Sequence, residues 1–160
     1  MLAYRMAGHN KEINKDFLNW VMPQMERYKG SYPTDNISQL LSKLSELSDQ
    51  QLSAYYNRKS EEGISLSVKT FSLPLLDSRI SMISLLKENA QKCIIEFRTQ
   101  IGILNELFEE AKFYHEKTFD SNLSDENHVI VRTNLESCYQ IIGRKARHLV
   151  DIIDGIIQEI

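Results

Sequence analysis

Hydrophobic residues recur at alternating steps of three and four over two long stretches of the chain, which is the pattern of one face of an α-helix. The stretches cover about 78–117 and 125–160. The connection between them, residues 119–123, is short and rich in turn formers, so the two helices must run antiparallel. The pattern therefore predicts a long two-helix hairpin. Its seams are Ile83, Leu86, Ala90, Ile94, Phe97, Ile101, Leu104, Phe108 and Ala111 in the first helix, and Val131, Leu135, Cys138, Ile142, Ala146, Leu149, Ile153, Ile156 and Ile160 in the second.

Shorter helices are predicted before the hairpin. Residues 10–28 carry apolar side chains at helical spacing, with Pro23 kinking or ending the regular part. Residues 30–33 have the composition of a turn. The next helix begins at Thr34 or Asp35, both of which are good N-cap residues.

A further break in this region is predicted from its polar residues. Ser48 and Gln51 have the spacing of a capping box, so a new short helix is expected to start there. The helical pattern weakens over residues 60–76, where apolar and polar residues alternate as they do in a strand. Nothing else in the chain alternates, so we predict an extended connection packed over the bundle. The sequence thus predicts an all-α fold: one antiparallel helical-bundle domain, residues 1–160, built on the long hairpin with shorter N-terminal helices packed on it.

Composition agrees with a globular chain. Hydrophobic residues make up 42% and charged residues 26% of the 160 positions, enough apolar surface to form a substantial core. The formal net charge of −3 gives no global basic field, so nucleic acid is not an expected partner on this ground. No window holds the roughly 20 apolar residues of a membrane span. Two cysteines fit a reducing, cytoplasmic compartment, and we expect both to be small core residues.

A cluster of basic residues in the second long helix carries the one enzymatic alternative. Arg144 and His148 are one turn apart and off the core face. This pair resembles the Arg–His motif of the HEPN ribonucleases, helical bundles that cleave RNA at a dimer interface. The resemblance implies that His148 serves as acid or base while Arg144 stabilises the charged phosphorane. Three residues separate the two here, one fewer than in the shortest form of that motif. In the alternative interpretation, Arg147 pairs with Asp151 and the other basic side chains are solvated.

Metal and cofactor sites are not expected. Carboxylate-bridged di-metal bundles need Glu-x-x-His on two helices, and the chain has no such motif. His115 continues the core stripe of its helix, so we expect it to be buried and hydrogen-bonded near the end of the bundle. Gly-rich phosphate loops and Gly-x-Ser-x-Gly elbows are also missing from the sequence.

The apolar surface of the hairpin exceeds what the shorter helices are expected to cover. Its final turns are interrupted only lightly by Asp154 and Glu159, so we expect them to stay bare. Exposed apolar patches of a few hundred Å² usually meet a partner. The sequence therefore predicts a non-enzymatic protein–protein interaction module with a scaffold, adaptor or regulatory role, able to form a homodimer. The expected interface residues are Ile152, Ile156, Ile157 and Ile160.

Overall fold

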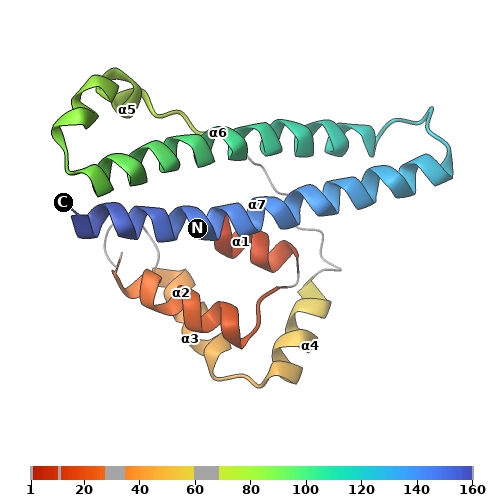
Figure 1. Ribbon diagram of the computed structural model, residues 1–160. Coiled ribbons are helices and arrows are strands. Elements are labelled where there is room, and N and C mark those ends of the chain that lie inside the picture. The colour runs from red at the N-terminus through yellow and green to blue at the C-terminus, as the bar shows by residue number, and fades with distance from the viewer. Residues whose placement is uncertain (1, 11, 28–34, 60–68, 160) are drawn as a thin grey trace. The chain divides into compact units, whose positions relative to one another are not determined.

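The computed structural model describes residues 2–10, 12–27, 35–59 and 69–159. Contacts between Cα atoms divide the chain into two compact units, Met1–Leu66 and Ser67–Ile160. All regular structure within the described residues is helical, with no strand (Figure 1). The prediction of an all-α fold is confirmed.

The second unit contains the predicted hairpin. Helix α6 (Glu88–Lys117) and helix α7 (Asp125–Glu159) lie side by side in opposite directions (Figure 1). Their facing sides carry the seams that the sequence predicts, because apolar residues spaced by three and four form one stripe on each helix. The buried members are Ala90, Ile101, Leu104, Phe108 and Ala111 in α6, and Cys138, Ile142, Ala146 and Leu149 in α7. The hairpin is confirmed, and so is the central part of each predicted seam, whereas the predicted seam residue Leu86 is 40% exposed and Ile160 lies outside the described residues.

Polar contacts fix the register of the two long helices. Lys145 Nζ donates a hydrogen bond to Gln100 Oε1 at 2.8 Å. Nearer the chain end, Asn89 Nδ2 lies 3.5 Å from Glu159 Oε1. The first turn of α6 therefore faces the last turn of α7. We call this end of the unit the hairpin base.

The opposite end of the hairpin is closed by local polar contacts. Ser124 caps α7, because its Oγ accepts the N–H of Asn127 at 3.3 Å. In the connection, Asp120 accepts a hydrogen bond from Lys117 Nζ at 2.9 Å and another from the N–H of Asn122 at 3.1 Å. The Lys117 ammonium is the main reason why the pKa of Asp120 is lowered. The sequence-predicted end of α6 and start of α7 are both confirmed.

The start of α6 was predicted incorrectly. The expected helix from residue 78 is replaced by a short helix α5 (Pro74–Ser78), a 3₁₀ helix η2 (Ile80–Leu85) and a break before Glu88. At the break, Leu86 has ψ 166° and Lys87 has ψ 149°, which are extended conformations. Gln91 Nε2 donates to the carbonyl of Leu86 at 2.7 Å and so satisfies a group that a continuous helix would have bonded internally.

Serine hydroxyls in this stretch form local hydrogen bonds to nearby backbone carbonyls. Ser78 Oγ donates to the carbonyl of Leu75, and Ser84 Oγ donates to the carbonyl of Ser81, each at 3.0 Å. Such local bonds compete with the backbone bonds of an α-helix. The hydrophobic spacing of residues 78–87 is real, but it is used by two short helices and a break.

The first unit consists of shorter helices. These are α1 (Leu2–His9), α2 (Lys15–Arg27), α3 (Asp35–Ser45) and α4 (Asp49–Lys59). Its hydrophobic core contains Ala7, Ile13, Phe17, Leu18, Val21, Leu41, Leu44 and Leu52. The sequence analysis predicted no helix at α1. Pro23 lies inside α2 without ending it.

The capping box between α3 and α4 is confirmed. The N–H of Ser48 donates to Gln51 Oε1 at 2.9 Å, and the N–H of Gln51 donates to Ser48 Oγ at 3.3 Å. The predicted turn at residues 30–33, the candidate cap Thr34 and the alternating residues 60–68 lie outside the described part of the chain.

Candidate functional site

Arg144 and His148, the residues of the HEPN-like alternative, both lie exposed on α7, one turn apart. His148 Nε2 is 3.2 Å from Glu96 Oε1 of α6, and both side chains are about half exposed. The imidazole that would act on RNA therefore has a carboxylate beside it. The negative charge of this carboxylate disfavours an approaching phosphate.

The predicted interface residues differ in exposure. Ile152 is only 7% exposed, so it belongs to the buried side of α7 instead of the bare surface expected from the sequence. Ile156 is half-buried, whereas Ile157 is 54% exposed. Ile160 lies outside the described residues. Of the three that the structure describes, Ile157 is the one that clearly presents a hydrophobic surface.

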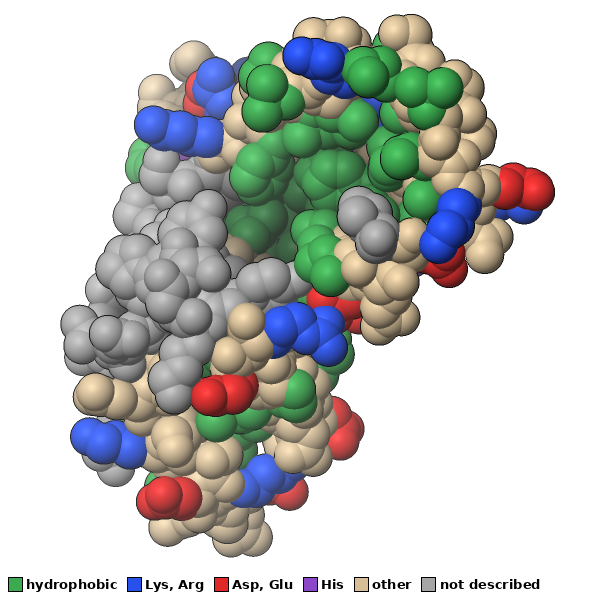
Figure 2. Space-filling view, turned by 90° about the vertical axis from the view of Figure 1, so that its left-hand side faces the viewer, with side chains coloured by type: hydrophobic (Ala, Val, Ile, Leu, Met, Phe, Trp, Pro, Cys, Tyr) green, Lys and Arg blue, Asp and Glu red, His purple; other side chains and the backbone are tan. Residues whose placement is uncertain are grey.

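The hairpin base offers more hydrophobic surface than the sequence analysis assigned to it. The side chains exposed there come from η2, the break that follows it and the end of α7. Figure 2 shows hydrophobic side chains gathered over this part of the molecule. The most exposed is Leu85, at 78%. We define the base surface as Ile80, Met82, Leu85, Leu86 and Ile157.

A second site missed by the sequence analysis lies where residues 69–78 cross α6. We call these residues, an extended segment followed by α5, the strap. Asn105 of α6 holds the extended part through its side-chain amide. Its Oδ1 accepts the N–H of Phe71 at 2.7 Å, and its Nδ2 donates to the carbonyl of Phe71 at 2.8 Å. This is the double exchange that a neighbouring β-strand would supply.

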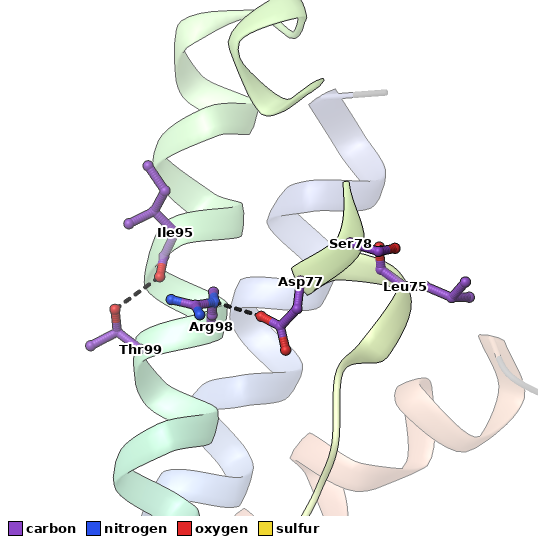
Figure 3. Close-up of polar contacts among 6 residues, drawn as sticks. All are labelled: Leu75, Asp77, Ser78, Ile95, Arg98 and Thr99. Atoms are coloured by element: carbon purple, nitrogen blue, oxygen red, sulfur yellow. Dashed lines mark hydrogen bonds and ion pairs between the residues drawn. The ribbon is translucent and has the colours of Figure 1, made fainter. Parts of the chain in front are cut away.

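Two further contacts hold the strap. Arg98 Nε donates to Asp77 Oδ1 at 2.8 Å, an ion pair whose side chains are about half exposed (Figure 3). The ring of Phe71 lies 5.9 Å from that of the buried Phe108. Helix α5 buries none of its own residues, and Leu75 points away from α6 (Figure 3). The strap is thus held by a few specific contacts and not by a core of its own.

An open groove of about 470 Å³ runs between the strap and α6. Its walls combine apolar and hydrogen-bonding groups, as peptide-binding grooves do. A Cβ atom added at Gly102 would meet no atom within 4 Å, so the groove is open above this position of α6. The lining residues are Phe71, Ser72, Leu73, Asp77, Arg98, Thr99, Ile101, Gly102 and Asn105.

The sequence contained a weak signal for this groove. Asparagine favours turns and caps over helix interiors, so Asn105 beside the buried Leu104 is an unexpected choice in the middle of a long helix. Its partner Phe71 is 34 residues away in the chain, and no local pattern indicates that pairing.

Three other candidate residues, His115, Cys93 and Cys138, differ in burial. His115 is exposed, with its ring in an edge contact with Phe119 at a centroid distance of 5.3 Å, so the prediction of a buried histidine was wrong. Cys138 is buried and Cys93 is half-buried, and both are free thiols.

Within the described residues, no group of three or more His, Cys, Asp or Glu side chains is placed to hold a metal ion. No helix in the same residues is long and apolar enough to cross a membrane.

Comparisons with protein-family models, curated proteins and solved structures find no match for this chain.

Proposed function

We propose that the protein is a non-enzymatic helical interaction module, with a scaffold, adaptor or regulatory role, that forms a homodimer through its base surface. The observation that carries this proposal is the exposure of several large hydrophobic side chains at one end of the hairpin, Leu85 above all. Leaving such groups in water costs about 25 cal/mol for each Å² of apolar surface. Contiguous patches of this kind usually mark an interaction site.

A second copy of the chain is the partner that we favour. The surface lies within one unit and is formed by η2, the break after it and the end of α7, so an identical surface can meet it across a two-fold axis. The position also agrees with the sequence-based prediction that the interface uses the C-terminal turns of α7, where Ile157 is exposed.

The proposal is tested by measuring the mass of the protein in solution. We expect light scattering coupled to size exclusion to give a dimer at micromolar concentration. Leu85→Glu or Ile157→Glu should convert it to a monomer, because each places a charge in the interface. Both positions are exposed in the single chain, so the helical circular dichroism signal should not change.

Val129→Glu provides a matched control. Val129 is 63% exposed, but it lies in the first turns of α7, at the other end of the hairpin. The same charge there should leave the dimer intact. A monomeric wild-type protein, or a dimer broken by Val129→Glu and not by Leu85→Glu, would contradict an interface at the base.

A further inference from the structure

The strap shows which chemistry the surface of α6 recognises. Asn105 bonds to the backbone of Phe71, Phe108 lies beside an aromatic ring, and Arg98 pairs with a carboxylate six residues later in the strap, within α5. None of these contacts depends on the strap being part of the same chain. A peptide that adopts the same conformation, an irregular stretch followed by a helical turn, would make them equally well.

We infer that the surface of α6 beneath the strap is a peptide-binding surface that the strap occupies in cis. The partner is a segment of another protein that carries an aromatic residue followed, in a helical turn, by an acidic residue at the spacing of Phe71 and Asp77. Asn105 would pair with the backbone of its aromatic residue, and Arg98 with its carboxylate. This inference deepens the proposed function by naming the chemistry of a partner, but it uses none of the residues of the base surface.

The weak hold on the strap makes exchange feasible. The Arg98–Asp77 pair is half exposed, and ion pairs of this kind contribute little to stability. Helix α5 buries no residue, so its release uncovers no core of its own. Replacing the strap by a partner segment exchanges one set of contacts for an equivalent set while α6 and α7 stay paired through their seams.

Occupation in cis also regulates the site. A tethered segment acts at an effective concentration on the order of millimolar, so it competes strongly with a free peptide. The apparent affinity for the peptide is the intrinsic affinity multiplied by the fraction of molecules in which the strap has left the α6 surface. The strap therefore inhibits binding at the α6 surface, because it occupies the place that the partner segment would take.

The test uses the full chain and a fluorescently labelled peptide with the sequence of residues 69–78. Phe71→Ala combined with Asp77→Ala gives a strap-disabled variant, in which the residues of α6 that contact the strap are unchanged. We expect this variant to bind the peptide at least tenfold more tightly than the wild-type chain does, as measured by fluorescence anisotropy. Adding Arg98→Ala and Asn105→Ala to the same variant should abolish binding.

A charge exchange separates recognition from a general change in stability. In the strap-disabled variant, Arg98→Glu should weaken binding of the peptide, and a peptide with lysine in place of Asp77 should restore it. Circular dichroism serves as the control that every variant keeps its helices. The inference is overturned if the strap-disabled variant does not bind, or if loss of Asn105 and Arg98 leaves binding unchanged. Since the base surface plays no part in this assay, its outcome is independent of the dimer measurement.

Discussion

Cys93 and Cys138 belong to the same hairpin, but their side chains differ in burial. Cys138 is 4% exposed, and its pKa is raised by burial first and by the nearby Glu110 carboxylate second. Cys93 is half-buried, and its Sγ would lie 3.8 Å from a Cβ at Gly155. This is an ordinary van der Waals distance, so α7 packs against the Cys93 side chain at this position.

The two thiols are expected to react at different rates with a thiol-specific reagent such as Ellman's reagent. The thiolate is the reactive species, so the raised pKa of Cys138 and the burial of its side chain both slow its reaction. Cys93 should account for the fast phase in the native protein, because its side chain is only half-buried. Cys93→Ser should remove that phase and Cys138→Ser should retain it. A fast phase that survives Cys93→Ser would show that the hairpin opens around Cys138.

The ribonuclease alternative is decided at the same scale, by Arg144 and His148. We expect the intact protein not to cleave single-stranded RNA, because Glu96 presents a negative charge beside the imidazole of His148. The measurement is gel analysis of labelled RNA, repeated with Glu96→Gln to remove that charge. Cleavage that is abolished by Arg144→Ala or His148→Ala, with unchanged melting curves, would establish the alternative and contradict a non-enzymatic function.

Among the elements, those predicted best from the sequence are the ones whose signals are local. The ends of the hairpin connection follow from turn composition and the Ser124 cap, and the α3–α4 break follows from Ser48 and Gln51. Each signal lies within four residues of the boundary it sets. The long seams also repeat often enough that a helix is the sole regular structure able to bury them together.

The elements that the sequence predicts poorly depend on competing local conformations or on contacts between residues far apart in the chain. The spacing of residues 78–87 matches that of a helix, but serine hydroxyls and the extended break at Leu86 and Lys87 prevail there. The strap depends on Asn105 reaching Phe71, a contact between distant residues that periodicity cannot reveal. His115 lies on the extension of the core stripe, but so close to the end of α6 that its ring meets Phe119 of the connection instead of the core. The candidate groove was therefore not predictable from the sequence, whereas the hairpin that carries it was.

At the scale of the whole molecule, the question is whether the two compact units unfold together. The sequence predicts one domain of residues 1–160, and this stays a prediction. Each unit contains buried hydrophobic residues of its own: Leu41 is fully buried in the first and Leu104 in the second. The single tryptophan, Trp20, lies in the first unit, so its fluorescence reports on that unit alone. Far-ultraviolet circular dichroism is dominated by α6 and α7, the two longest helices described.

Leu104→Ala separates cooperative from independent unfolding. Truncating a fully buried leucine costs about 2–5 kcal/mol, whereas Val129→Ala at an exposed position away from the base surface should change stability by less than about 0.5 kcal/mol. In a single domain, Leu104→Ala shifts the circular dichroism and Trp20 transitions to the same lower denaturant concentration, because coincident probes are the mark of two-state unfolding. A shift in circular dichroism with an unchanged Trp20 transition would show two independent domains. The first unit would then have to be stable by itself, which is demanding for about 60 residues because so small a domain buries a limited share of its surface. We therefore expect the two transitions to coincide.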